Sequence, residues 1–444
     1  MESTFKKIGE LSDPFTGNGQ YDQMYADHYK TQQYPHISDL LNSYKRINFA
    51  CANINANGCA GHELKLFVKT RSSDKKTVLN TAKVGDDKQD FLRQEFKIKD
   101  SEVIEEVIEH PVLGLLKEVN DEPFLNSYTL KALTFLYFDI ASAAYWWVDI
   151  DKFLNRPKNI WILPSQHVLP KRESGSDKIV DYYEYVNGDK VKRYSPEEII
   201  QFIPLGVKNP YLEGIGSAEG SYEASLLSNK LASMTSHLLD NDGRPDILYS
   251  PKEGIGAAEA TGLEKRLNQK YSQGRSGGWH VADEPADIKP MNYPPRDIAR
   301  LDINEQAKIE ICNAYSVPVA FLDNRNISRE TIFGALTLHA IFGIKPRLGI
   351  YAETLNKRLI PFYDESGRLF FGYDDPVPED KEAKLAEVTR QIEVGMIEPN
   401  EGRKKYNLPP HSDPEASRLK RINAPGLSGA GPRQASRESG EAEK

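Results

Sequence analysis

The chain has 444 residues, of which 39% are hydrophobic and 27% charged, and its formal net charge is −8. At about 100–200 residues per domain, this length predicts roughly two to four structural units with at least one hydrophobic core. Proteins that hold nucleic acid tightly usually carry a basic excess, so the acidity excludes a tight DNA-binding protein. A loose or transient contact with DNA stays open.

Three cysteines are present, Cys51, Cys59 and Cys312. An odd and sparse set argues against a disulfide framework. The spacing of Cys51 and Cys59 fits no common zinc motif, and we expect all three to be small buried side chains.

The sequence predicts neither a signal peptide nor a membrane span. Residues 1–20 are polar and lack an apolar core. The most apolar stretch, residues 130–150, contains Lys131, Asp139 and Asp149, and it predicts a buried helix followed by a strand. We therefore expect a cytoplasmic protein without membrane contact.

Residues 1–35 are rich in charges and glycine and predict a flexible arm, and residues 36–210 predict a mixed α+β domain. Helical spacing covers 37–55, whereas residues 72–100 are charged and predict loops. Further helices are expected at 110–117 and 127–138, and strands at 63–69, 144–150, 159–163, 180–186, 190–194 and 199–203. Asn187-Gly188 predicts a hairpin, and the stretch 195–198 predicts a helix start.

A turn-rich break at 209–217 precedes two long helices that bracket a small insert. The first helix is expected over 218–240, with an apolar stripe of Leu227, Leu231, Met234 and Leu238 and several serines that allow a close neighbour. The insert, 241–294, predicts a strand at 244–250, a helix at 257–271 and a strand at 279–282. The second long helix is expected over 296–315. This pattern indicates a helical hairpin with a small domain at its tip.

A polar segment, 323–329, leads into a third long helix expected over 330–359. Glycines and Pro346 inside this helix predict a kink. A strand at 368–373 follows, and then a helical pair at 378–394 and 399–406, joined at Gly395. From residue 411 onward the composition predicts disorder.

Short catalytic and nucleotide-binding motifs are absent from the sequence. Gly214-Ile215-Gly216 resembles part of a dinucleotide fingerprint, but the third glycine, Gly220, comes one residue late, so a plain turn is expected. The glycine-rich stretch 274–278 lacks the residues of a phosphate loop. We therefore expect no enzyme, no catalytic residue, no cofactor and no metal.

From residue 199 onward, a series of short motifs is similar to the portal proteins of tailed double-stranded DNA bacteriophages. In chain order they are Ile199–Phe202, the turn 209–217, Gly243-Arg244-Pro245, Glu310-Ile311-Cys312, Val317-Pro318, Lys345–Leu348, Leu355–Leu359, Gly395–Asn400, Glu401-Gly402-Arg403 and Leu408–Pro410. The resemblance covers about residues 105–411, and it is carried by the order and spacing of the motifs.

The resemblance implies an α+β portal fold with four regions and two tails. A mixed α/β wing takes 36–215 and 330–375, where the second part is the kinked helix and a strand. A two-helix stem, 216–241 and 295–317, brackets a small α/β clip, 242–294, and a tunnel loop follows at 319–329. A helical crown takes 376–411, between the flexible arm 1–35 and a disordered tail at 412–444.

The resemblance also implies a ring of twelve identical subunits at one capsid vertex, through which the genome is packaged and ejected. The implied partners are the terminase large subunit, a head–tail adaptor, the major capsid protein and double-stranded DNA that passes without sequence recognition. The implied locations are the virion and, during assembly, the host cytoplasm. The candidates for DNA proximity are Asn324, Arg325, Asn326, Ser328 and Arg329 in the tunnel loop, and Arg300 and Lys308 on the second stem helix.

Two alternatives from other classes stay open. One is a phage-encoded enzyme with a motif-poor active site, such as a transferase or hydrolase, and the other is an adaptor or scaffold that binds only protein. The helix–insert–helix pattern disfavours the enzyme, because enzymes of this size seldom need an elongated stalk. A ring would bury the apolar and small-residue faces of the stem helices between neighbouring subunits.

Overall fold

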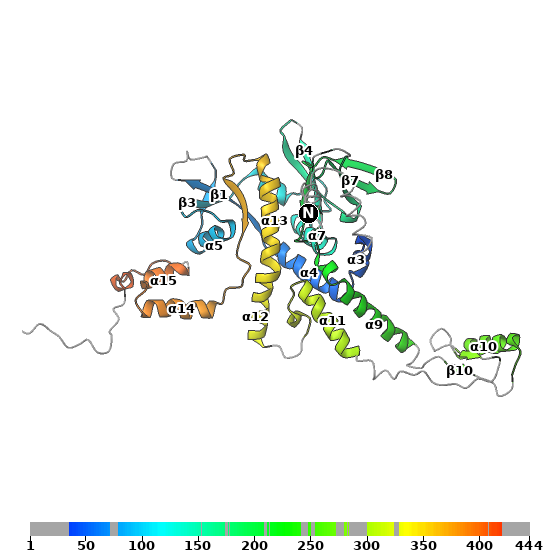
Figure 1. Ribbon diagram of the computed structural model, residues 1–444. Coiled ribbons are helices and arrows are strands. Elements are labelled where there is room, and N and C mark those ends of the chain that lie inside the picture. The colour runs from blue at the N-terminus through cyan, green and yellow to red at the C-terminus, as the bar shows by residue number, and fades with distance from the viewer. Residues whose placement is uncertain are drawn as a thin grey trace, which may run out of the picture. The chain divides into compact units, whose positions relative to one another are not determined.

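The computed structural model describes residues 35–71, 79–151, 153–173, 176, 178–207, 211–212, 214–240, 247–249, 254–271, 279–281, 283, 300–323, 328–406 and 408–419. Two compact units are distinguished, Met1–Val377 and Pro378–Lys444. Both helices and small sheets are present (Figure 1), which confirms the α+β class. None of the described helices is long and apolar enough to cross a membrane.

Three helices form the centre of the first unit: α3 (Ile37–Ser43), α4 (Arg46–Gly61) and α7 (Ser127–Ile140). The single helix expected at 37–55 is broken at Tyr44-Lys45, and Arg46 begins α4 with a positive φ of 53°. The face of α4 that is buried is made of small side chains, among them Cys51 and Cys59. This confirms that both cysteines serve as small buried residues, and Cys312 is buried too.

A four-stranded antiparallel sheet has the order β12-β1-β3-β2, from β1 (Leu64–Arg71), β2 (Thr81–Lys83), β3 (Glu102–Val107) and β12 (Leu369–Tyr373). Residues 72–100 were expected to be loop-rich, which is wrong for β2 and for the helix α5 (Asp86–Phe96). That helix is highly charged, but Leu92 packs with Phe67 and Phe370 of the sheet. A few well-placed apolar residues therefore outweigh its polar composition.

Two three-stranded sheets follow, with orders β5-β4-β9 and β6-β7-β8. Their strands are β4 (Ala144–Asp151), β5 (Arg156–Leu163), β6 (Val168–Lys171), β7 (Tyr182–Asn187), β8 (Lys190–Tyr194) and β9 (Ile199–Phe202). Asn187 pairs with Lys190 and Gly188 has a φ of +60°, which confirms the hairpin. The helix start expected at 195–198 is wrong: the backbone N–H of Ser195 donates to the Glu198 carboxylate, and the turn leads into β9.

The helical hairpin consists of α8 (Ser217–Gly220), α9 (Tyr222–Asp240) and α11 (Arg300–Ala314). Ser228 contacts Asn304 across the pair, whereas Ala218 and Ala224 cluster with Ala307 and Ile311, so α9 and α11 run antiparallel (Figure 1). In the insert, β10 (Ile247–Tyr249) pairs in parallel with β11 (Trp279–Val281), and α10 (Ala257–Tyr271) connects them. The expected strand–helix–strand order is confirmed for these residues, and 241–246, 272–278 and 284–299 lie outside the described residues.

The third long helix has two α-helical parts, α12 (Arg329–Leu338) and α13 (Lys345–Arg358), joined by a π-helical stretch, His339–Ile344. Figure 1 shows the two parts in line. The sequence predicted a kink in this helix; the structure instead has a π-helical interruption within the glycine- and proline-containing stretch. Leu348, Tyr351 and Leu355 bury one side of α13 in the largest core cluster, together with Leu359 just after the helix.

Four shorter helices complete the first unit: α6 (Pro111–Lys117), η1 (Ser165–His167), η2 (Val319–Phe321) and η4 (Ile360–Phe362). In the second unit, α14 (Lys381–Glu393) and α15 (Pro399–Lys405) confirm the expected pair, with Gly395 at a φ of +73° between them. The prediction of disorder from residue 412 onward is wrong for η5 (Pro414–Ser417). Asn400 holds this segment through hydrogen bonds with His411 and Ser417. Residues 420–444 lie outside the described residues.

Candidate functional site

Of the residues expected near DNA, Arg300 and Lys308 lie on α11, and Ser328 and Arg329 lie at the start of α12. Ser328 is the N-cap of α12, and its hydroxyl accepts the backbone N–H of Thr331 at 3.1 Å. Arg329 is the first residue of α12 and is exposed. Arg300 begins α11, and its side chain is not described. Asn324, Arg325 and Asn326 lie outside the described residues.

Lys308, the remaining candidate, is held by two carboxylates. Its Nζ lies 3.5 Å from Asp323 and 3.7 Å from Glu305, and its side chain is only 14% exposed. The two acids balance its charge and would weaken its attraction for a phosphate. The contact with Asp323 fixes the start of the polar segment to α11.

The segment 319–323 is more apolar than the expected tunnel loop. Val319, Phe321 and Leu322 pack against the helical core that includes α4 and α11. The ring of Phe321 lies edge-on to that of His339, with ring centroids 5.4 Å apart. The polar part of the loop therefore starts at Asp323, after an anchored turn.

A buried polar cluster lies where the helical hairpin meets the rest of the unit. We call it the stem junction and define it as Asn55, Asp139, Ser217, His339 and Arg347. Its centre is an ion pair in which Arg347 on α13 donates to Asp139 on α7, at 2.8 Å from Nη2 and 3.1 Å from Nε to the same carboxylate oxygen. Both side chains are more than nine-tenths buried. An ion pair this deep needs further hydrogen bonds to offset its desolvation.

The neighbouring elements supply those hydrogen bonds. Ser217, at the start of α8, donates to Asp139 at 3.2 Å. Arg347 also donates to the backbone carbonyls of Gly343 at 2.7 Å and Tyr315 at 3.5 Å. Tyr315 directly follows α11. The pair therefore joins the start of α8 and the end of α11 to α13 and to α7.

Asn55 on α4 connects this pair to His339. Its amide nitrogen donates to Asp139 at 3.2 Å and to the carbonyl of Tyr315 at 2.8 Å. Its amide oxygen is therefore the acceptor for Nε2 of His339, at 2.8 Å. This places the imidazole proton on Nε2 when His339 is neutral.

The electrostatics of the stem junction follow from its burial. Burial, with the charge of Arg347 as a second cause, lowers the pKa of His339 to about 4. Burial opposes the charge of Arg347, but the adjacent carboxylate outweighs this effect and raises the pKa of Arg347 above its ordinary value. At neutral pH the cluster therefore holds a neutral imidazole beside one compensated ion pair.

Glycine is required at two points of the junction. A Cβ atom on Gly216 would lie 2.5 Å from the backbone oxygen of Asp139, and one on Gly343 would lie 2.7 Å from the ring of His339. The backbone N–H of Gly216 donates to the Ser142 hydroxyl at 2.8 Å. Gly214-Ile215-Gly216 thus serves close packing, consistent with the plain turn expected from its spacing.

Two serines of α9, Ser225 and Ser228, are buried, whereas Ser233 and Ser236 are exposed. Ser225 receives a hydrogen bond from the amide of Asn48 on α4 at 2.8 Å, and Ser228 donates to Asn304 on α11 at 3.2 Å. Leu227 of the expected apolar stripe is 43% exposed. The small residues in the first half of α9 are therefore buried within one chain, and Leu227 of the leucine stripe is left outside.

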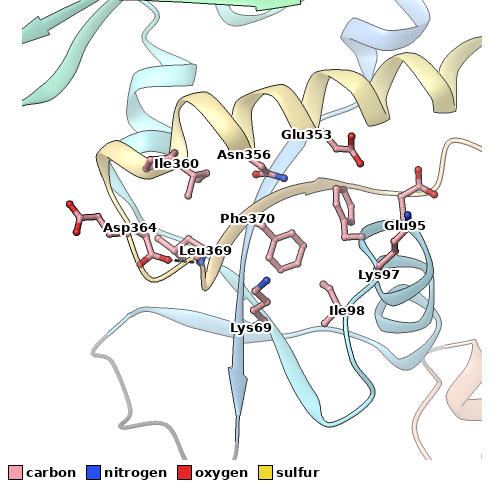
Figure 2. Close-up of a pocket in the computed structure, with 14 residues that line it drawn as sticks. Lys69, Glu95, Lys97, Ile98, Glu353, Asn356, Ile360, Asp364, Leu369 and Phe370 are labelled. Carbon is pink, nitrogen blue, oxygen red and sulfur yellow. Dashed lines mark hydrogen bonds between the residues drawn. The ribbon is translucent and has the colours of Figure 1, made fainter. Parts of the chain in front are cut away.

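A surface hollow of about 420 Å³ lies between α13, β12 and the end of α5 (Figure 2). Phe370 and Ile98 form part of its apolar floor, and charged residues of both signs surround it. Two of its polar side chains already have structural partners: the Asp364 carboxylate accepts backbone N–H groups of Arg368 and Leu369, and Asn356 pairs with the backbone of Phe371. Across the described residues, no group of three or more His, Cys, Asp or Glu side chains is placed to hold a metal ion.

The stem junction was not predicted from the sequence. Asp139 was noted only as a charge that argues against a membrane span, and Arg347 only as part of a motif. A signal was available, because an aspartate inside a long apolar run is rarely buried without a partner. The partner itself is 208 residues away, and spacing cannot reveal it.

Comparison with known proteins gives one family and a set of similar folds. A family model described as phage portal protein matches residues 92–407. A search of curated proteins finds no match. The neck of an empty gene transfer agent (GTA) particle, computed with C6 symmetry, is similar with a TM-score of 0.55 and 18% identity, over 84% of this chain and 94% of that chain.

The neck of a native GTA particle, computed with C12 symmetry, has a TM-score of 0.53 and 18% identity, over 82% of this chain and 90% of that chain. An HK97-family phage portal protein from Corynebacterium diphtheriae has a TM-score of 0.44 and 13% identity, over 76% of this chain and 93% of that chain. At these identities the similarity concerns the fold.

Proposed function

Because the portal family model spans well over half of its residues, the chain belongs to the phage portal protein family, and we propose that it is one subunit of a ring at a capsid vertex. The genome passes through this ring during packaging and ejection. The family match carries the proposal, and the antiparallel α9–α11 pair with its small insert supports it. The proposed role of the chain is therefore structural.

We assign the regions of the ring subunit by chain order. The elements from α3 to β9, together with α12, α13 and β12, form the wing. The stem is α8, α9 and α11, the clip is the insert with β10, α10 and β11, and the crown is α14 with α15. The stem junction then lies where the stem joins the wing, so forces on the stem would reach the long helix through Arg347.

We propose a homo-oligomer of twelve subunits, and the twelvefold symmetry of a similar neck structure supports this number. The proposed partners are the terminase large subunit, a head–tail adaptor and the major capsid protein. The proposed location is the portal vertex of the virion, after assembly in the host cytoplasm.

The segment 319–329 is the proposed tunnel loop, with Asn324, Arg325, Asn326, Ser328, Arg329 and, on the stem, Arg300 and Lys308 near the DNA. Arg329 is the exposed cation at the end of the loop. The side chain of Ser328 caps α12, and Lys308 is paired with Asp323, so we infer that these two shape the loop rather than hold the phosphates. A net charge of −8 suits a channel that lets DNA slide, because strong basic contacts would retain it.

The proposal is tested by replacing residues 324–329 with a Gly-Ser linker of equal length. We expect rings of unchanged size, because the replaced stretch follows the anchored turn, but heads that package or retain less DNA. A linker of the same composition in place of residues 174–177 is the control. Normal DNA content and infectivity with the 324–329 linker would reject the tunnel-loop assignment.

A further inference from the structure

The helix α12 is apolar and exposed at the same time. Between Thr331 and Ile344 the only ionisable side chain is that of His339, which is buried. Large apolar side chains along α12 and the π-helical stretch are exposed in the single subunit: Ile332 by 42%, Leu336 by 44%, Leu338 by 53%, Ile341 by 39% and Phe342 by 62%. Contiguous exposed apolar surface on a folded protein commonly marks a contact with another molecule.

These side chains form two faces. Ile332 and Leu336 are four residues apart and share one face, which we call face 1. Leu338 comes two residues after Leu336, about 200° further around the helix, and therefore lies on the opposite side. Ile341 and Phe342 come three and four residues after Leu338 and continue its side, which we call face 2. A helix that is apolar on opposite sides is normally covered on both.

The chemistry of the two faces favours protein over DNA. Phosphates are held by cations, and all five side chains of the two faces are apolar; the cations at the ends of this stretch are Arg329, three residues before Ile332, and Lys345, which is paired with Glu95. A subunit of a cyclic ring has one neighbour on each side and contacts the two through different surfaces. Two opposite apolar faces on one helix match that arrangement.

We propose that α12 packs between two further copies of this chain, with face 1 against one neighbour and face 2 against the other. The helices would together form a closed apolar belt directly after the tunnel loop. This inference rests on the proposed ring function, since it names the partner of α12 within that ring.

Substitution on each face tests the proposal. Ile332→Gln with Leu336→Gln changes face 1, and Leu338→Gln with Phe342→Gln changes face 2. Each pair should raise the protein concentration needed for ring formation by about tenfold or more, because apolar burial is lost at every contact in the ring. Unfolding temperatures of the isolated subunits should stay unchanged, since the side chains are exposed there. Val191→Gln on β8, where the side chain is 58% exposed, is the matched control.

Ring formation is measured by mass photometry over a dilution series. Rings that form as readily in both pairs as in the wild type would overturn the inference and leave the ring function standing. A wild-type protein that forms no ring even in assembled heads would instead reject the proposed function.

Photocrosslinking identifies the partner directly. Benzoylphenylalanine at position 336 or 338 should yield dimers and higher ladders in wild-type rings, with the two positions joined to different peptides of the neighbouring copy. Crosslinks confined to the same chain, or to DNA in filled heads, would overturn the proposal.

Discussion

At the scale of residues, the stem junction shows how one ion pair connects distant parts of the chain. Among the described residues, Arg347 and Asp139 compensate each other's charge, and neutral groups from α4, α8 and the end of α11 supply further hydrogen bonds. Removal of one partner from such a pair leaves an uncompensated buried charge, whereas removal of both does not.

The substitution Arg347→Met should lower the free energy of unfolding by about 3–5 kcal/mol, because Asp139 is left charged and buried. The double variant with Asp139→Leu should recover much of this loss. Urea denaturation of the isolated subunit measures both. A single variant as stable as the wild type would show that the pair does not hold the junction together.

The pKa of His339 makes part of the stability depend on pH. The pKa is about 4 in the folded chain and about 6.5 in the unfolded chain, so protons bind preferentially to the unfolded state between these values. This contribution is complete above pH 6.5 and is lost as the pH falls toward 4. His339→Gln should therefore flatten the decline in unfolding temperature across this range, while His411→Gln, at an exposed position, should not. Parallel curves for His339→Gln and the wild type would contradict the assignment.

At the scale of elements, local patterns predicted most helices and strands, including the insert and the interrupted long helix. They did not predict the elements and strand pairings that depend on tertiary contacts. The charged helix α5 exists because Leu92 meets the sheet, and β1 pairs with β12, which lies about three hundred residues later. Periodicity also could not predict which side of α9 faces the core, because its leucines and its serines both repeat at helical spacing.

The burial of Ser225 on α9 can be tested by enlarging its side chain. Ser225→Leu should destabilise the subunit by about 1–3 kcal/mol, because the added atoms overfill the contact with Asn48 on α4. Ser233→Leu, on an exposed part of the same helix, should leave the unfolding temperature unchanged. Equal effects of the two substitutions would mean that Ser225 does not pack inside the subunit.

At the scale of the whole molecule, the portal fold could be predicted from the order of motifs, but the stem junction and the two faces of α12 could not. The motifs are short stretches that can be recognised along the chain. The junction, in contrast, brings together residues from five separate elements, and the exposure of the α12 faces is a property of the tertiary structure. The acidic charge, which first counted against a DNA partner, suits a ring that DNA crosses without being held.

Electron microscopy of the purified protein tests the central claim most directly. We expect cyclic rings, twelvefold when assembled with capsid proteins, with a central hole wide enough for a DNA duplex. A monomer that persists at high concentration and in the presence of its capsid proteins, or a closed particle without a hole, would contradict the portal assignment.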